Sequence, residues 1–192
     1  MNQAADTRSR IIDRASELMT QRGFNGFSYS DISQPLGVKN AAIHYHFPSK
    51  TDLVRALIEE QHQMLRYSTS HFMAYGGSAR EQLEGLFRYT LSQCHRGRPV
   101  CIVGALAADY DAFPDDIKEA NHSFMKDTGD WLIRVLEVGR EQGEFKFEGS
   151  AKGKAMSIQA IMQGGRQVYR IYGEKYLERL FAQIRSELGI EA

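Results

Sequence analysis

The chain has 192 residues and carries 24 lysines and arginines against 24 aspartates and glutamates, so its net charge is zero when the histidines are neutral. This length suits one or two domains, and the sequence holds no apolar run long enough to span a membrane. The first residues are polar rather than signal-like. The two cysteines predict free thiols in a reducing compartment, so we expect a cytoplasmic protein without a membrane partner.

The first predicted helix runs up to Gly23, where a glycine can end it. Asp6 or Thr7 is expected to cap its start. Phe24 and Phe27 follow, and their rings are expected to fill the space between this helix and the next. The apolar residues on one face of this helix, at helical spacing, are Ile11, Ile12, Ala15, Leu18 and Met19.

The stretch from Ser28 to Lys50 is predicted to form two short helices joined by a tight turn. Ser28 with Asp31 three residues later resembles a capping box, with Asp in place of the usual Glu, so a helix should begin near Tyr29. Gly37 can adopt the left-handed conformation that closes this helix. Two helices joined by a short turn that contains glycine form the helix-turn-helix arrangement.

The second helix of this pair is expected over Lys39–His46. Pro48 cannot continue it, because proline lacks an N–H and its ring clashes with the preceding turn, and Ser49 caps the next helix. A helix this short and polar buries too little surface to be stable by itself. We therefore expect it to present side chains to something outside the protein, and a DNA groove is the best candidate.

A long and irregularly spaced pattern occupies residues 7–53. Its members are Thr7, Ile11, Ala15, Leu18, Gly23, Phe24, Phe27, Ser28, Asp31, Ile32, Leu36, Gly37, Val38, Ile43, His44, Tyr45, His46, Phe47, Pro48, Ser49, Lys50 and Leu53. This pattern resembles the N-terminal domain of the TetR family of bacterial transcriptional repressors. The resemblance implies an all-α fold, with a helix-turn-helix DNA-binding domain over residues 1–50 and a ligand-binding and dimerisation domain over residues 51–192.

The resemblance also implies which residues contact DNA, and they are Ser28, Lys39, Asn40, Ala41, His44, Tyr45, His46 and Lys50. Those directly after the turn, Lys39–Ala41, would face base edges, where lysine can donate to guanine and asparagine can pair with adenine. The later ones would hold phosphates, and Ser28 would touch the DNA backbone. Three residues depart from the family pattern: His44 replaces a common Tyr, Pro35 a usual Ala, and Lys39 a common Ser or Thr cap.

Charge is distributed unevenly along the chain. Residues 1–55 hold seven lysines and arginines against five aspartates and glutamates, so this part is weakly positive and the remainder is weakly negative. A dimer would bring two such positive parts to a palindromic operator and keep its negative parts away from it. We expect modest non-specific DNA affinity with a clear dependence on salt.

The rest of the chain is predicted to be almost entirely helical, for about nine helices in all. Its segments are a long helix from Thr51 to about Met73, a break over Tyr75–Ser78, a helix over Ala79–His95, a loop over Arg96–Pro99, a short buried helix over Val100–Tyr110, a long helix from Phe113–Pro114 to about Gln142, a loop over Gly143–Ser150, and last helices over Ala151–Tyr172 and Glu174–Leu188.

The last two helices are predicted to join two copies of the chain into a homodimer, as they do in the family. The residues expected at that interface are Ile158, Ile161, Val168, Leu177, Leu180, Phe181, Ile184 and Leu188. The paired glycines Gly164 and Gly165 would allow close helix approach, at a cost in helix propensity. The alternative is that this apolar stripe faces only the core of its own subunit.

The middle helices are expected to bind a small-molecule effector, again as in relatives. The candidate lining residues are Phe87, Leu91, Cys101, Leu106, Tyr110, Phe113, Phe124, Met125, Trp131, Met162 and Tyr169. Large aromatic and methionine side chains suit a mostly apolar ligand, although the same pattern is also typical of an ordinary core. Such a ligand would shift the helix that begins at Ser49, change the spacing of the two reading helices, and release a repressor from DNA.

Cys101 supports a second hypothesis, a sensor of electrophiles or oxidants. The segment from Val100 to Asp109 is similar to a branch of the family in which a cysteine opens this buried helix, and some members of that branch react through it. A thiol in the first turn of a helix feels the positive end of the helix dipole, and the dipole favours the reactive thiolate. The alternative is that Cys101 is a small buried hydrophobe.

An enzyme is not expected. The sequence has no glycine-rich phosphate loop, no Gly-x-Ser-x-Gly elbow and no His-Glu-x-x-His helix, and its scattered histidines show no metal-ligand spacing. We therefore predict no catalytic residue, no metal and no cofactor. A helical adaptor that binds only protein remains as the alternative from another class of function.

Overall fold

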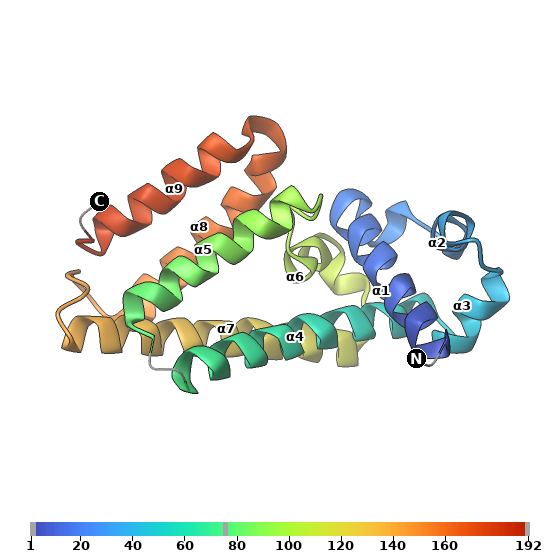
Figure 1. The fold of residues 1–192 in the computed structure, drawn as a ribbon, viewed down its shortest axis with the longest axis horizontal. Helices are drawn as coiled ribbons and strands as arrows, with labels where there is room; N and C mark the ends of the chain where they lie inside the picture. Colours follow the sequence, from blue (N-terminus) through green and yellow to red (C-terminus); the bar gives the residue numbers. More distant parts are fainter. Residues whose placement is uncertain (1–2, 75–76, 191–192) are drawn as a thin grey trace. The chain divides into compact units, whose positions relative to one another are not determined.

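The structure is a computed structural model that describes residues 3–74 and 77–190 (Figure 1). Within these ranges it contains α-helices and 3₁₀ helices and no strand, so the predicted all-α fold is confirmed. The helices are α1 (Gln3–Arg22), η1 (Phe24–Gly26), α2 (Tyr29–Leu36), α3 (Asn40–His46), α4 (Lys50–Ala74), α5 (Ala79–His95), α6 (Ile102–Leu106), η2 (Ala107–Ala112), α7 (Asp115–Glu141), α8 (Ala151–Tyr172) and α9 (Glu174–Glu187).

Most predicted boundaries agree with these helices, and two do not. Helix α1 begins at Gln3, so the expected cap at Asp6 or Thr7 is wrong; alanine is a strong helix former and the helix runs through the two alanines before Asp6. The segment predicted as one helix from Val100 is divided, because α6 ends at Leu106 and a 3₁₀ helix follows. Of the predicted break over residues 75–78, Tyr75 and Gly76 lie outside the described residues.

Two compact units make up the chain, and they do not follow the order of the sequence. The first unit contains Met1–Gln63 and Cys101–Phe124, and the second contains Met64–Val100 and Met125–Ala192. Residues 101–124 therefore pack with the N-terminal helices, although the sequence analysis placed them in the ligand-binding domain. The functional division at residue 50 remains a prediction.

The first unit is built around helix α1, against which α2, α3 and α6 pack. Ile11, Leu18 and Ile43 are completely buried in its core. Leu106 and Phe113, from the inserted segment, belong to the same core. Helix α3 contributes only Ile43 as a buried residue, so most of this short helix faces away from the protein.

The second unit has a core of its own, to which α5, α7, α8 and α9 contribute. The rings of Phe87 and Phe181 stack with their centroids 4.4 Å apart. Arg185 lies over the Phe87 ring and donates to both carboxylate oxygens of Glu84, at 2.6 and 2.8 Å. Helices α8 and α9 pack against each other, joined through the single residue Gly173.

Two glycines inside helices of this unit make a matched pair for a stability test. A Cβ at Gly139 would overlap the buried ring of Phe145 and approach the Ala79 Cβ to 2.9 Å, whereas a Cβ at Gly164 would meet nothing within 4 Å. We expect Gly139→Ala to lower the free energy of unfolding by about 1–3 kcal/mol through overpacking. We expect Gly164→Ala to raise it by up to about 1 kcal/mol through helix propensity.

Urea unfolding followed by circular dichroism measures both changes. An equal response of the two variants would contradict the packing around Gly139. The predicted close approach at Gly165 is also present, since a Cβ there would come within 2.5 Å of Leu180 on α9. That approach joins two helices of one subunit.

Candidate nucleic-acid interface

Helix α2 begins with the predicted capping box. The Ser28 backbone N–H and hydroxyl both donate to the Asp31 carboxylate, at 2.8 and 2.7 Å, and Arg22 pairs with the same carboxylate at 3.1 Å. The helix ends at Gly37, which has a left-handed φ of 67°. The guanidinium of Arg10 donates to the Leu36 carbonyl at 3.1 Å, so α1 satisfies one of the unpaired carbonyls at the end of α2.

Helix α3 presents most of its side chains to solvent. Lys39, Asn40, Ala41, His44 and Tyr45 are exposed, and Tyr45 most of all, with 81% of its surface accessible. Lys39 precedes the helix in an extended conformation and makes no side-chain cap. The predicted reading helix is thus present, one residue shorter than expected, with its start left without the usual capping side chain.

Asn40, the first residue of α3, is held by two serines of α2. The Ser33 hydroxyl donates to the Asn40 amide oxygen, and the Asn40 amide nitrogen donates to the Ser30 hydroxyl at 3.2 Å. Ser33 is 5% exposed, so its hydroxyl is a buried polar group. Sequence analysis missed both serines, because nothing in the spacing of α2 indicated which polar residues would face α3.

The end of α3 is held by Tyr29 of α2. The Tyr29 hydroxyl donates to the Phe47 carbonyl at 2.8 Å, and burial, followed by the nearby charge of Asp52, raises the pKa of Tyr29 to about 12. The His44 ring packs edge-on against Tyr29 with centroids 4.8 Å apart. His44 Nδ1 lies 3.3 Å from the Pro48 carbonyl oxygen. His44 therefore packs at the corner between α3 and α4.

Lys50 does not extend toward solvent. Its ammonium donates to the backbone carbonyls of Phe24 and Phe27 and lies 4.6 and 4.0 Å from the centroids of their rings. Burial lowers the pKa of this ammonium, and the charge of Asp31 partly opposes that effect. The predicted phosphate contact of Lys50 is untested, but in this structure the side chain connects α4 to the turn between α1 and α2.

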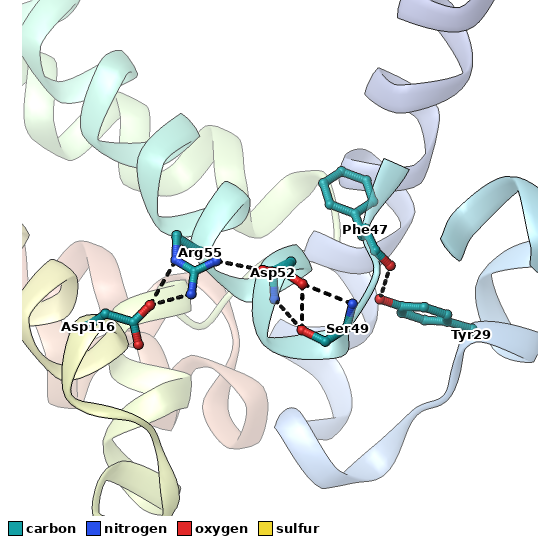
Figure 2. A network of polar contacts seen from close by, with 6 residues as sticks. All are labelled: Tyr29, Phe47, Ser49, Asp52, Arg55 and Asp116. Atoms are coloured by element: carbon teal, nitrogen blue, oxygen red, sulfur yellow. Dashed lines mark hydrogen bonds and ion pairs between the residues drawn. The ribbon is translucent and has the colours of Figure 1, made fainter. Parts of the chain in front are cut away.

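The start of α4 is tied to the start of α7 by charged side chains (Figure 2). The Ser49 hydroxyl oxygen accepts from the Asp52 backbone N–H at 3.1 Å, so Ser49 caps α4 as predicted. In return the Ser49 backbone N–H and hydroxyl donate to the Asp52 carboxylate, at 3.0 and 2.6 Å. Arg55 donates to Asp52 at 2.7 Å and to Asp116 through two nitrogens, of which Nε lies at 3.0 Å. Sequence analysis did not find the pairing of Arg55 with Asp116, because these residues are distant in the chain.

The capping carboxylates predict how this unit responds to acid. Hydrogen bonds from Ser28, together with Arg22, hold the pKa of Asp31 below its ordinary value of 3.8, and Ser49 and Arg55 do the same for Asp52. Below that value the unfolded chain binds more protons than the folded one, so stability rises with pH there. The stabilisation is therefore present above about pH 4–5 and is lost as the pH falls through the folded-state pKa values.

Asp52→Asn should flatten this acid response, because asparagine does not titrate. Urea midpoints measured between pH 3 and pH 7 for the parent and the variant test the expectation. If the urea midpoints of the two proteins depend on pH in the same way, the Asp52 cap contributes nothing to the acid response.

The predicted dimerisation residues divide by burial. Five of them are at most 2% exposed and belong to the core of their own subunit: Ile158, Leu177, Phe181, Ile184 and Leu188. For these five the alternative holds, namely that the apolar stripe packs inside its own subunit. They therefore have almost no surface left for a partner. Ile161, Val168 and Leu180 are half-buried. The strongly exposed apolar residues of α8 are others, namely Met156, Ile171 and Tyr172.

The predicted effector-binding residues divide between the two compact units. Those in the first unit are Cys101, Leu106, Tyr110, Phe113 and Phe124, and those in the second are Phe87, Leu91, Met125, Trp131, Met162 and Tyr169. Tyr110 is 39% exposed, and the others are buried or half-buried. Leu106 and Phe113 belong to the core that supports α3, so packing alone accounts for their burial.

No helix in the described part of the chain is both long enough and apolar enough to cross a bilayer.

Comparisons with known proteins agree with this architecture. Residues 11–57 match the family model described as bacterial regulatory proteins, tetR family, and residues 79–184 match the tetracyclin repressor-like C-terminal domain. The HTH-type transcriptional regulator LmrA of Bacillus subtilis (strain 168) is 24% identical over 166 residues, which cover 83% of this chain and 84% of that protein. The HTH-type transcriptional regulator TtgR of Pseudomonas putida is 36% identical over 61 residues, which cover 32% of this chain and 29% of TtgR.

Solved structures show the same fold over nearly the whole chain. A TetR-family transcriptional regulator from Agrobacterium tumefaciens is 28% identical, with a TM-score of 0.82, and the match covers 97% of this chain and 95% of that one. A TetR transcriptional regulator from Legionella pneumophila is 29% identical, also with a TM-score of 0.82, over 93% and 95% of the two chains. The predicted resemblance is confirmed: the chain belongs to the TetR family and is a DNA-binding transcriptional regulator.

Proposed function

We propose that this regulator is a repressor that binds a palindromic operator as a homodimer and leaves it when a small, mostly apolar compound binds. The exposed edge of α3 carries the proposal. That helix buries only Ile43, and Lys39 at its N-cap and Ala41 and Tyr45 within it are exposed. A seven-residue helix with this distribution is supported from behind by α1 and α2 and open on its other side.

Base reading falls to the residues at the start of α3. Lys39 is exposed and its ammonium can donate to guanine, and Ala41 is small enough for its methyl group to contact thymine. Tyr45 and His46, at the end of the helix, would hold phosphates, and the exposed Ser28 would contact the DNA backbone by turning its hydroxyl from Asp31 to a phosphate. Phosphate contacts position the protein while base contacts select the sequence.

The dimer surface would use the exposed apolar residues of α8. Ile171 is 75% exposed and Tyr172 is 67% exposed at the end of that helix, and Met156 is 61% exposed nearer its start. Large apolar side chains that are this exposed are typical of surfaces that bind another protein. A homodimer formed through this surface would supply two α3 helices, one for each half-site of a palindromic operator.

Repression is supported by a relative. IcaR of Staphylococcus epidermidis, 33% identical over 52 residues that cover 27% of this chain, is named a negative transcriptional regulator of a biofilm operon. The match to IcaR lies within a short segment, so it supports repression as the mode of action and leaves the operator and the effector of this chain open.

Selection of random-sequence DNA by the purified full chain tests the function. We expect an enriched palindrome whose half-sites lie about one duplex turn apart, and weakening of that complex by apolar compounds from a small-molecule panel. Recovery of DNA without any sequence preference would reject the proposal and favour the protein-binding adaptor.

Sensing by Cys101 remains a second candidate, because the residue stands at the N-cap of α6 as a free thiol. Two observations weigh against it: Cys101 is 8% exposed, and α6 has only five residues. Burial also raises the pKa of the other thiol, Cys94. In a Cys94→Ser variant we expect iodoacetamide to alkylate Cys101 no faster than free cysteine. A faster rate would support the electrophile sensor instead.

A further inference from the structure

We propose that Asn40 is a positioning residue: together with Ser30 and Ser33 it forms a polar latch that sets the place of the reading helix on its supporting helix. The inference rests on the proposed DNA reading by α3 and assigns within it a role other than base contact. The latch is defined by two side-chain hydrogen bonds, Ser33 to Asn40 and Asn40 to Ser30.

The latch joins the two helices at the point where they diverge. Ser30 and Ser33 are three residues apart on α2, so they lie on one face of that helix. Asn40 is the first residue of α3, directly after the turn. One amide group thus binds both serines, and its oxygen and its nitrogen each have a partner on α2.

Helix α3 needs such a contact because its own start is weak. Lys39, at the N-cap, makes no side-chain hydrogen bond to the helix, whereas Ser, Thr, Asp or Asn at this position would satisfy one of the free backbone N–H groups. The helix has only seven residues and one buried side chain. Side-chain bonds from α2 to Asn40 replace part of the restraint that a cap would supply.

The same bonds limit what Asn40 can do for DNA. A neutral amide has two donor hydrogens and two acceptor positions, and the two serines occupy one of each and so fix the directions of the remaining donor and acceptor. Turning the amide from this orientation toward an adenine edge would break the bond to Ser33, whose buried hydroxyl has, among the described residues, the Ser30 carbonyl at 3.4 Å as its other acceptor. Asn40 therefore holds Lys39 and Ala41, its two neighbours, in place for the bases.

The test uses the operator selected by the parent protein and three single variants, Asn40→Ala, Ser30→Ala and Ser33→Ala. We expect each to weaken operator binding by about 3–10-fold, the worth of one or two hydrogen bonds. The losses should be non-additive: adding Ser30→Ala or Ser33→Ala to Asn40→Ala should cost less than about twofold more. Ser30→Thr keeps the hydroxyl and should bind like the parent.

The pattern of lost specificity separates positioning from contact. If the latch positions α3, substituting each operator base pair in turn should show discrimination reduced at several positions of the half-site in all three variants. Binding to non-specific DNA and its salt slope should stay unchanged, because no phosphate contact is removed. Circular dichroism melts report whether each variant is folded. Ser30 is only half-buried, so Ser30→Ala still tests the latch if Ser33→Ala does not fold.

Two results would overturn the latch. In the first, Asn40→Ala loses discrimination at a single base pair while both serine variants bind like the parent, which makes Asn40 a base reader. In the second, all three variants bind like the parent. If the parent protein selects no DNA sequence, the proposed function itself is rejected. This outcome is known before any variant is measured, so it is distinct from a failure of the latch.

Discussion

Replacing Ile171 with glutamate is expected to leave a folded monomer that binds the operator at least about 100-fold more weakly than the parent. In a dimer the second subunit binds its half-site intramolecularly, and the high effective concentration raises the overall affinity by at least about that factor. Ile171 is 75% exposed, and the adjacent Tyr172, whose ring lies 5.5 Å from that of Tyr176, is 67% exposed. If this surface joins the dimer, the new carboxylate would be buried against apolar groups without a partner, and such burial is costly. The core of the subunit would be unaffected.

Analytical ultracentrifugation and operator titration measure the two parts of this prediction. Val138→Glu is the matched control, since Val138 is a partly exposed apolar residue (39%) of α7 in the same compact unit. It receives the same charge and should remain a dimer. An Ile171→Glu protein that stays dimeric and binds normally would move the interface away from the end of α8.

Replacing Lys50 with alanine is expected to destabilise the first compact unit by about 2–4 kcal/mol. This is the expected contribution of the two hydrogen bonds that the half-buried ammonium donates. The ammonium is the donor for two backbone carbonyls in the turn between α1 and α2. Removing it leaves the carbonyls of Phe24 and Phe27 without this partner and takes away the cation that lies over their rings. Lys50→Met keeps most of the stem, so it should lose less stability than the alanine variant.

Salt dependence distinguishes this role from the phosphate contact that the family resemblance implies. A structural Lys50 leaves the slope of log affinity against log salt unchanged in the folded Lys50→Met protein, whereas a lost phosphate contact lowers the slope by about one. Thermal melts followed by circular dichroism measure the stability part. Unchanged melting together with a reduced slope would show that the side chain leaves Phe24 and Phe27 to bind DNA.

Residues 101–124 contribute two side-chain contacts to the unit that contains α3. Phe113 packs edge-on against Phe24 with centroids 4.8 Å apart, and Asp116 pairs with Arg55 in the first turns of α4. Phe24 is also one of the two partners of Lys50. The segment that leads into α7 and the first turn of that helix are therefore in direct contact with η1 and with the beginning of α4.

Local sequence signals determined most of the helices, most of their ends and the position of the short helix α3. The Ser28–Asp31 box, the left-handed Gly37, and Ser49 with Asp52 in its first turn act over three or four residues, so they are visible in the sequence, and the structure contains each of them. The apolar spacing of α1 likewise predicted residues that are at most 3% exposed. The family pattern over residues 7–53 added the function, because it depends on the order of these same local elements.

Only the tertiary structure decided which side chains meet across the chain. The apolar stripe of α9 was compatible with a partner subunit or with its own core, and packing places Leu177, Phe181 and Ile184 in the core. Lys50 and Asn40 were expected to face DNA, yet their polar atoms bind groups of η1 and α2. Helical periodicity specifies which residues share a face, but it does not specify what that face contacts, because the contact depends on the relative placement of segments distant in sequence.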